Sequence, residues 1–409
     1  MLNPRARIIV TGLVGLYPLG GVAYDYFQYF LGLSRLGHDV YYHEDSWSWP
    51  YNPVERQTSS DGTYSANFIS DYINAHAPSL REKWHYLHLH ETSFGMSRNH
   101  FDQVASTADL FFNISGACQI PQSLSSQCVK VFLDTDPGYN QIMLKEKFWW
   151  SSNVDRWCDS VWAHDQFFTY AENMYGSDCL IPRLGIPWKT TRTSVIRDLW
   201  QSLIPASPQN TSAWTTVMTW NGFKGRLLYD GVEYKSKDGE FEKIITLPED
   251  SSVAFKIAVG GKAPTKQLSA YGWEIVDAPQ ETLTTQSYQA FIAQSKGEFS
   301  IAKHVYVALR SGWFSSRSAC YLASGRPVVV QDTGFSHTVP VGAGLLTFQS
   351  REEAIDAIRE VEGNYEWHCK AARELSEDCF DSDTILRQFI EDVFAARDPM
   401  EKGYGQAPT

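Results

Sequence analysis

The most constraining feature of the sequence is a run of about two dozen residues, 311–335. It combines a turn rich in hydroxyl groups, a short helical stretch, a Gly-Arg-Pro break and an apolar Pro-Val-Val-Val segment. That segment has no polar face, which predicts a strand covered on both sides, as in a parallel sheet. Hydroxyls and free backbone N–H groups at the start of a helix favour anion binding. The run therefore predicts a phosphate site beside a parallel sheet.

The length of the chain and its alternating pattern set the architecture. At 409 residues it exceeds the usual size of one hydrophobic core, so we expect two domains. Strands alternate with helices in both halves, and a stretch of turn-forming residues ending near 210 indicates a linker. We predict an α/β fold with two Rossmann-like, doubly wound domains facing a cleft. The expected boundaries are 1–205, 206–385, and 386–409 for the end of the C-terminal helix and the tail.

The first half begins with a βαβ pattern. A strand at 8–10 leads into a glycine-rich loop that ends at Gly20 and Gly21, followed by a helix at 22–36 and a strand at 39–42. Glycines at a helix N-terminus let a ligand approach the backbone, although they can also serve only a tight turn. The aromatic and polar segment at about 46–100 is interpreted as an insertion with a helix near 66–75.

Three further strands are expected at 108–114, 129–133 and 160–163, each followed by polar residues. Asp134 and Asp136 follow the second of these strands, and His164 follows the third. Two such acids can hold a divalent metal or supply a general base, and we favour a base or an acceptor contact. We expect only one of these two acids to point into a crevice. Asp136 can equally cap a helix, and His164 can be structural.

Basic residues gather around the hydroxyl-rich turn. Lys303 and Arg310 precede it and Arg317 lies within it, in a chain whose formal charge is −12. Such cations stabilise a departing diphosphate. The alternative is that some of them pair with Glu298 or Asp332.

Composition excludes several classes of protein. The net charge of −12 and a pI near 5.4 make nucleic acid an unlikely partner. Seven scattered cysteines without CxxC spacing favour a reduced, cytoplasmic setting, and no apolar run is long enough for a transmembrane segment. His85, His88, His90 and Glu91 match no strong zinc template, so we expect packing there and no metal.

The two halves together resemble GT-B glycosyltransferases. The first half is similar to the entry pattern of the group 1 enzymes: a strand, Gly20-Gly21-Val22, a helix and Leu-Gly-His-Asp-Val at 36–40. The second half is similar to the donor-site pattern of the CgeB-like branch, Ser-x-Arg-x-x-Glu-x-x-Ala-x-Gly-x-Pro. Residues 315–327 carry that pattern from Ser315 to Pro327, with Cys320 at the glutamate position.

This resemblance implies a nucleotide-diphosphate sugar, expected to be UDP-linked, on the C-terminal domain and an acceptor on the N-terminal domain. No metal or other cofactor is needed where protein cations carry the leaving charge. Asp134, Asp136 or His164 would take the acceptor proton if the enzyme inverts, and Arg317→Ala would lower turnover far more than thermal stability. The expected cleft loop on the acceptor side consists of Gly20, Gly21 and Asp25. The expected donor residues are Lys303, Arg310, Ser315, Ser316, Arg317, Ser318, Asp332 and Thr333.

One departure from the family pattern leaves the function open. Retaining group 1 enzymes carry two glutamates with seven residues between them, and their positions fall here on Gly312 and Cys320. The contact to the nucleotide ribose must then come from elsewhere, or the donor differs. The alternatives are a non-catalytic sugar-nucleotide-binding protein and a GT-B-fold sugar-nucleotide epimerase. The sequence does not define the base, the sugar, the acceptor, the stereochemistry or the oligomeric state.

Overall fold

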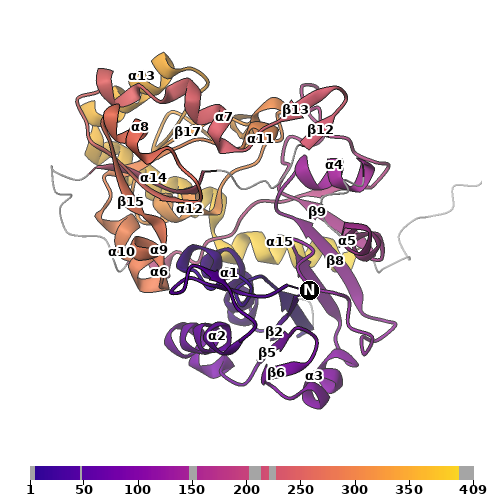
Figure 1. The fold of residues 1–409 in the computed structure, drawn as a ribbon. Coiled ribbons are helices and arrows are strands. Elements are labelled where there is room, and N and C mark those ends of the chain that lie inside the picture. The colour runs from indigo at the N-terminus through magenta and orange to yellow at the C-terminus, as the bar shows by residue number, and fades with distance from the viewer. Residues whose placement is uncertain (1–4, 47, 147–153, 202–212, 221–226, 396–409) are drawn as a thin grey trace, which may run out of the picture.

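The computed structural model describes residues 5–46, 48–146, 154–201, 213–220 and 227–395. Its two lobes each contain a mostly parallel sheet with helices packed around it (Figure 1). The linker expected near 205–210 lies outside the described residues. No helix within the described ranges is long and apolar enough to cross a membrane.

The first sheet is built from strands of the N-terminal half, and only its last strand, β6, runs antiparallel to its neighbour. Strand β1 is fully buried at Ile8, Ile9 and Val10 and lies between β2 and β7, so the strand order reverses at this point. The segment interpreted as an insertion contributes β5 and β6 to the edge of this sheet. The spatial order is β10 (Lys189–Thr190), β9 (Gln166–Thr169), β8 (Val129–Asp134), β7 (Leu110–Ile114), β1 (Arg7–Thr11), β2 (Asp39–Ser46), β5 (Trp84–His88) and β6 (Thr92–Gly95).

The second sheet is entirely parallel within the described residues and reverses its order between β11 and β16. Every residue of β17 is buried, which confirms the strand predicted from the Pro-Val-Val-Val run. Its spatial order is β15 (Trp273–Asp277), β14 (Phe255–Gly260), β11 (Trp214–Thr219), β16 (Gly297–Ser300), β17 (Val328–Gln331) and β18 (Leu345–Phe348).

Helices connect the strands, and two short hairpins lie outside the sheets. The hairpins are β3 (Tyr51–Asn52) with β4 (Gln57–Thr58), and β12 (Leu227–Tyr229) with β13 (Val232–Tyr234). The helices of the first half are α1 (Gly20–Arg35), α2 (Thr63–His76), α3 (Arg98–Ala105), α4 (Tyr139–Glu146), α5 (Val154–Trp162) and α6 (Asp198–Gln201). Those of the second half are α7 (Lys237–Phe241), α8 (Thr265–Ala270), α9 (Ala278–Thr282), α10 (Thr285–Gln294), α11 (His304–Ala308), α12 (Ser316–Ala323), α13 (Arg351–Gly363), α14 (Tyr365–Phe380) and α15 (Ser382–Ala395).

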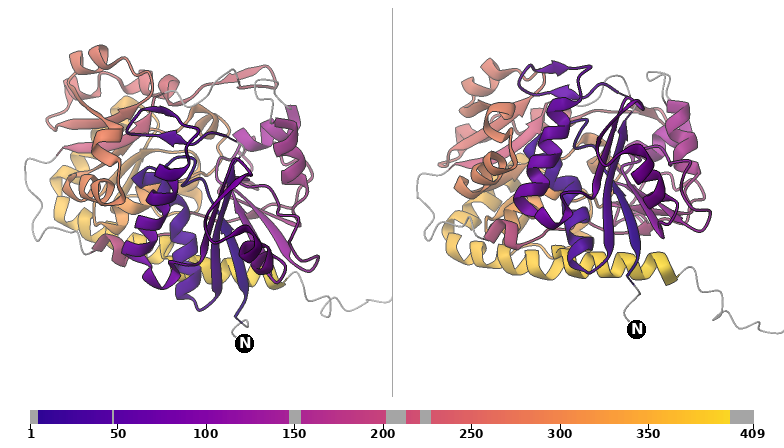
Figure 2. Two further views of the ribbon diagram at one scale, coloured as in Figure 1. Left: turned by 60° about the horizontal axis from the view of Figure 1, so that its bottom comes forward. Right: turned by 90° about the horizontal axis from the view of Figure 1, so that it is seen from below.

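The C-terminal helices connect the two lobes. Helix α14 packs on α12 of the second lobe, and α15 continues beneath the first sheet, where it appears in yellow in Figure 2. The ring of Phe389 on α15 lies 4.3 Å from that of Phe112 and 4.9 Å from that of Phe168. Gln166 also donates a hydrogen bond of 2.9 Å to the carbonyl of Val393. The last helix therefore completes the core of the first lobe.

One predicted element is wrong. Residues 160–163 were expected to form a strand, but most of them belong to α5, and the strand that follows is β9. The buried residues of α5 are Val154, Cys158 and Val161, which have helical spacing. His164 therefore precedes a strand rather than ending one.

Candidate functional site

A cleft of about 850 Å³ lies between the lobes. Its lining includes residues that follow the carboxyl ends of strands in both sheets: Ser115 after β7, Asp136 after β8 and Gly261 after β14. Ligands of open α/β sheets bind at this edge, near the point where the strand order reverses. The cleft is therefore the candidate site.

Three cations on the C-terminal side of the cleft form what we call the cationic wall: Lys237, Lys303 and Arg317. They come from the start of α7, the residue before α11 and the first turn of α12. Ser315 and Ser316, at the N-terminus of α12, line the same wall. No acid from the C-terminal half lines the cleft within the described residues. A helix N-terminus with hydroxyls and three nearby cations is suited to an anion.

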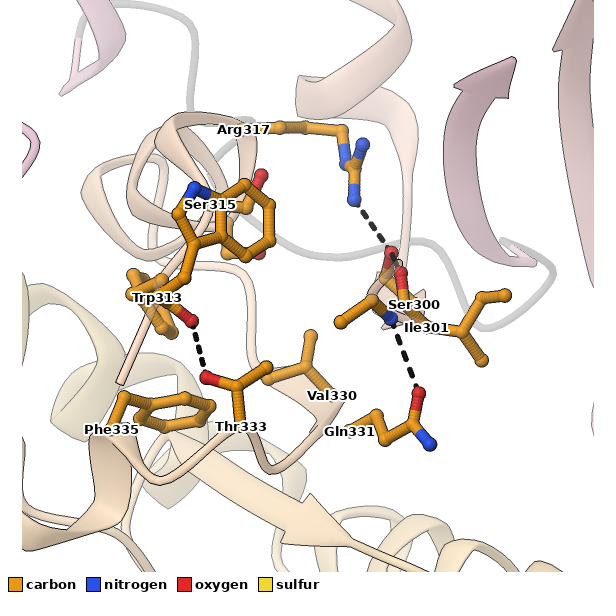
Figure 3. A pocket seen from close by; sticks show the side chains of 12 residues that line it. Ser300, Ile301, Trp313, Ser315, Arg317, Val330, Gln331, Thr333 and Phe335 are labelled. Atoms are coloured by element: carbon orange, nitrogen blue, oxygen red, sulfur yellow. Dashed lines mark hydrogen bonds between the residues drawn. The ribbon is translucent and has the colours of Figure 1, made fainter. Parts of the chain in front are cut away.

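Arg317 is held in place by three hydrogen bonds. Its guanidinium donates to Glu298, to the Val217 carbonyl and to the Ser300 hydroxyl, each at 2.6 Å. Figure 3 shows the guanidinium directed at Ser300, beside a small cavity that adjoins the cleft. Glu298 is fully buried, so the pair is a buried salt bridge. The sequence left two roles open for Arg317, pairing with Glu298 and binding a phosphate. The structure shows the pair with Glu298, and Arg317 also lines the cleft.

Lys237 is the functional candidate that sequence reasoning missed. Its ammonium makes no hydrogen bond or ion pair with any described residue, and burial together with Arg317 and Lys303 holds its pKa well below the usual value. Lys235, two residues earlier, is exposed, and nothing in the local sequence separates the two lysines. The signal is tertiary, because α7 places Lys237 beside residues that lie far away in the sequence.

The N-terminal side of the cleft forms an acidic wall, defined by Asp25 on α1 and Asp136 after β8. Asp25 is exposed and lines the cleft. Desolvation of its carboxyl group raises its pKa to about 7, and Ser316 and Arg317 partly offset that rise. Asp136 forms an ion pair of 2.5 Å with Lys303 and accepts a hydrogen bond from Tyr306, so it links the two walls of the cleft.

The other two sequence candidates for a proton acceptor do not line the cleft. Asp134 is completely buried, and its oxygens accept hydrogen bonds from Asn140, Gln141 and Thr169 and from the backbone N–H of Asp136. Burial raises its pKa to about 6. His164 is also buried, with its ring within 3.1 Å of Asn113, and burial lowers its pKa to about 4. The expectation that one acid of the Asp-x-Asp pair faces the crevice agrees with the placement of Asp136.

The remaining predicted donor residues separate into two groups. Ser318 and Thr333 line the small cavity next to the cleft, and Thr333 donates a 2.6 Å hydrogen bond to the Trp313 carbonyl. Arg310 and Asp332 pair with each other at 3.0 Å, and Arg310 also pairs with Asp178. Neither Arg310 nor Asp332 lines the cleft, so this pair stabilises the loop around it.

The two glycines before α1 have different environments. Gly21 lines the cleft, as expected for a cleft loop. Gly20 instead contacts the other lobe: its N–H donates to the Leu283 carbonyl at 3.1 Å, and a Cβ there would lie 2.3 Å from the Thr284 oxygen. The glycine permits close approach of the lobes at this point.

The surroundings of Gly312 and Cys320 bear on why neither position holds the glutamate of the group 1 pattern. Gly312 has a φ of +79°, and a Cβ at this position would lie 2.4 Å from the Asn173 nitrogen. A glutamate therefore does not fit there without a backbone shift. Cys320 is buried inside α12, in a hydrophobic cluster to which both lobes contribute. The departure from the family pattern is thus built into the backbone and the packing.

The histidine-rich segment is a packed cluster. His43 and His85 stack with Phe101, and His88 is 2.8 Å from the Ser60 carbonyl oxygen. Among the described residues, no group of three or more His, Cys, Asp or Glu side chains could hold a metal ion.

Several solved structures resemble the whole chain. An alpha-glucosyltransferase in complex with UDP and a 13-mer DNA containing an HMU base has 10% identity and a TM-score of 0.55, covering 95% of this chain and 100% of its own. The HepE protein of Anabaena, solved with UDP and glucose, has 10% identity and a TM-score of 0.53, over 95% and 99% of the two chains. Sucrose-phosphate synthase of Thermosynechococcus elongatus has 13% identity and a TM-score of 0.51, over 96% and 100%.

No protein-family model matches the sequence, and no curated protein matches it. At 10–13% identity the structural similarities establish the fold. The chain has the GT-B fold of glycosyltransferases, with two Rossmann-like domains, and the predicted fold class is confirmed.

Proposed function

We propose that this GT-B-fold chain is a glycosyltransferase that moves a sugar from a nucleotide-diphosphate donor to an acceptor bound in the cleft. The observation that carries the proposal is the cationic wall. Lys237, Lys303 and Arg317 converge beside the N-terminus of α12 in a chain of formal charge −12. Such a cluster stabilises the charge that develops on a departing diphosphate, without requiring a metal ion. UDP in two of the similar structures favours a UDP-linked donor.

In the proposed reaction, the diphosphate of the donor lies at the cationic wall and the acceptor hydroxyl lies near the acidic wall. The acceptor oxygen bonds to the anomeric carbon of the donor, and the bond from that carbon to the diphosphate oxygen breaks, leaving its electron pair on the diphosphate. The hydroxyl proton passes to a carboxylate of the acidic wall. Asp25 is the better proton acceptor, because Asp136 is already engaged by Lys303 and Tyr306. A pKa near neutrality is also suited to general-base catalysis.

A non-catalytic sugar-nucleotide-binding protein is the second candidate. It is favoured by the steric exclusion of a glutamate at Gly312 and by the burial of Cys320. The contacts that the two glutamates make in retaining group 1 enzymes would then have to come from other residues.

A two-stage experiment tests both candidates. Thermal unfolding is first measured with UDP, GDP, ADP and their glucose conjugates, since a ligand at one hundred times its Kd adds about 2.7 kcal/mol of stability. Release of the nucleoside diphosphate from the stabilising donor is then measured with and without acceptors. Donor binding with release supports the transferase, and binding without release supports the second candidate. The absence of a shift with every nucleotide would contradict both.

A further inference from the structure

A buried carboxylate holds the loop that follows β1. Glu44 lies on β2 and is fully buried. Its Oε2 accepts hydrogen bonds of 2.7 Å from the backbone N–H of Gly15 and from the Tyr42 hydroxyl, and its Oε1 accepts one of 2.6 Å from the N–H of Leu16. Two successive N–H groups directed at one anion form a nest, the arrangement that binds phosphate in glycine-rich loops. Here a side chain fills the nest, so these N–H groups are not available to a phosphate.

The charge of Glu44 depends on these hydrogen bonds. Among the described residues, no Lys or Arg forms an ion pair with it. The titratable side chains around it are Tyr26 on α1, Tyr42 on its own strand, Tyr86 on β5 and Cys118 after β7. Burial raises the pKa of all four, so they are neutral near pH 7. The loop N–H groups and the Tyr42 hydroxyl are therefore what stabilises the carboxylate.

The loop held by Glu44 is part of the cleft. Its residues Tyr17 and Leu19 line the cleft directly. The Leu16 carbonyl also accepts a hydrogen bond of 2.9 Å from the N–H of Tyr51, which begins the β3–β4 hairpin. The contacts of Glu44 therefore extend to the hairpin as well as to the loop.

The hairpin in turn reaches the second lobe. Tyr51 and Arg56 line the cleft, and the guanidinium of Arg56 pairs at 2.7 Å with Asp277 at the end of β15. A displacement of the loop after β1 would thus change both the cleft lining and this contact between the lobes.

We propose that Glu44 is a positioning residue of the cleft, whose carboxylate fixes the loop after β1 and, through that loop, the β3–β4 hairpin. This rests on the proposed transfer reaction. Glu44 itself is not placed to touch a substrate, because it is fully buried and does not line the cleft. The ionised carboxylate accepts from both loop N–H groups. A proton on Oε2 would be donated to Tyr42 and would weaken the bond from Gly15.

This arrangement makes the loop sensitive to pH. Burial raises the pKa of Glu44 to about 7, and the bonds from Gly15, Tyr42 and Leu16 partly offset that rise. The loop should therefore loosen as pH falls through about 7. Hydrogen exchange of the full chain without ligands, followed by mass spectrometry of the peptide that spans the loop, measures this directly.

Two matched variants locate the effect. The amide of Glu44→Gln cannot accept from both N–H groups, so protection of the loop at about pH 8 should fall about tenfold and lose its pH dependence. Asp45→Asn makes the same chemical change one residue along, on a carboxylate that pairs with His90 at 2.7 Å, and should leave the protection unchanged. Equal effects in the two variants would overturn the proposal, as would pH-independent protection in the native chain.

Tyr42→Phe supplies a second measurement that keeps the buried carboxylate. It removes a hydrogen bond that lowers the pKa of Glu44, so the midpoint of the exchange profile should move to higher pH. An unmoved midpoint would overturn the proposal even where Glu44→Gln does not fold.

Turnover separates a positioning role from a general loss of structure. At about pH 8, Glu44→Gln should lower kcat/KM for transfer about tenfold or more, while the Kd for UDP stays within about twofold. An unchanged kcat/KM, or an equal loss of UDP affinity, would overturn the positioning role. If the native chain neither binds a nucleotide nor transfers a sugar, the proposed function fails, and the exchange comparison still decides whether Glu44 holds the loop.

Discussion

The ammonium of Lys303 lies 2.5 Å from Oδ2 of Asp136, and this ion pair joins the cationic wall of the cleft to its acidic wall. Tyr306 donates its hydroxyl to the other oxygen of the same carboxylate. Asp136 therefore holds Lys303 at the place where the diphosphate of a donor is proposed to bind. A bound diphosphate must compete with Asp136 for this ammonium.

The competition predicts that Asp136→Asn binds UDP more tightly than the native chain. Both side chains are about a quarter exposed, at 24% and 29%, so the pair is worth about 1 kcal/mol or less and the gain is at most about fivefold. Calorimetric titration with UDP measures it. Asp165→Asn, which weakens the exposed Lys130 pair outside the cleft, should leave the affinity unchanged. Weaker UDP binding in Asp136→Asn would show that the carboxylate supports the site.

Lys237 should contribute to diphosphate affinity while costing stability. Lys237→Met removes a half-buried ammonium that has no hydrogen-bond or ion-pair partner among the described residues, so the melting temperature should rise or stay the same. UDP affinity should fall about 10- to 100-fold, the value of one charge-assisted hydrogen bond. Lys235→Met, at an exposed position two residues away, is the matched control. Equal losses in the two variants would remove Lys237 from the site.

The depressed pKa of Lys237 gives this site a pH dependence. A bound diphosphate favours the ammonium form, so binding takes up a proton and UDP affinity should fall as pH rises. Stability changes in the opposite direction: between the depressed pKa and the ordinary value the unfolded chain holds more protons, so stability rises with pH. Titrations over a pH series should show a shallower dependence in Lys237→Met. An identical dependence would place the titration on another group.

The raised pKa of Asp25 predicts how kcat/KM of the transfer reaction changes on the acid side of its pH profile. Burial raises its pKa to about 7, so the carboxylate becomes available as a base only as pH rises through about 7, and kcat/KM should rise over the same range. Asp25→Asn should lose this limb and lower turnover about 10²- to 10⁴-fold, while UDP binding remains. Retention of the limb in the variant would assign the base to another group.

Arg317 should affect folding as well as turnover. Arg317→Ala leaves Glu298 charged and fully buried, and breaking a buried pair in this way costs about 3–5 kcal/mol. Sequence reasoning predicted a loss of turnover far larger than the loss of stability, and the buried pair adds a stability loss to that expectation. Denaturant unfolding measures the loss of stability, and the rate of nucleoside-diphosphate release measures the loss of turnover. UDP titration shows separately whether the site still binds its ligand. Arg317→Ala combined with Glu298→Gln should recover part of the stability, and if UDP affinity then also returns, Arg317 only positions the turn.

The sequence alone predicted those features that depend on residues close to one another in the chain. Apolar runs identified β1 and β17. The sequence also predicted that only one of Asp134 and Asp136 would face a crevice, without indicating which, and the structure places Asp136 in the cleft lining. A local cause can also mislead: residues 160–163 have the composition of a strand but lie in α5 or just after it. Short apolar runs do not distinguish a strand from a buried helical segment.

The features that the sequence did not define depend on packing between distant elements. Arg317 was recognised as basic, but its partner Glu298 was one of two possible acids until β16 and α12 were placed side by side. Lys237 was overlooked because only the folded chain brings it to Arg317 and Lys303. Arg310 was assigned to the phosphate, and the fold pairs it with Asp178 and Asp332.

Close approach of the lobes at Gly20 yields the last prediction. A Cβ at this position would lie 2.3 Å from the Thr284 carbonyl oxygen, and backbone atoms have little room to move. Gly20→Ala should therefore separate α1 from α10 and cost about 1–3 kcal/mol of unfolding free energy. Because α1 carries Gly21 and Asp25 into the cleft, turnover should fall as well.

Gly363→Ala is the matched control for this substitution. Gly363 is the last residue of α13, and a Cβ there meets no atom within 4 Å, so alanine should be neutral or stabilise the helix by up to about 1 kcal/mol. Thermal and denaturant unfolding of the two variants compare the same chemical change with and without a neighbour. If Gly20→Ala is as stable as the native chain, the prediction is contradicted. The backbone near Thr284 can then move to accommodate a Cβ at little cost, and this contact does not fix the relative position of the lobes.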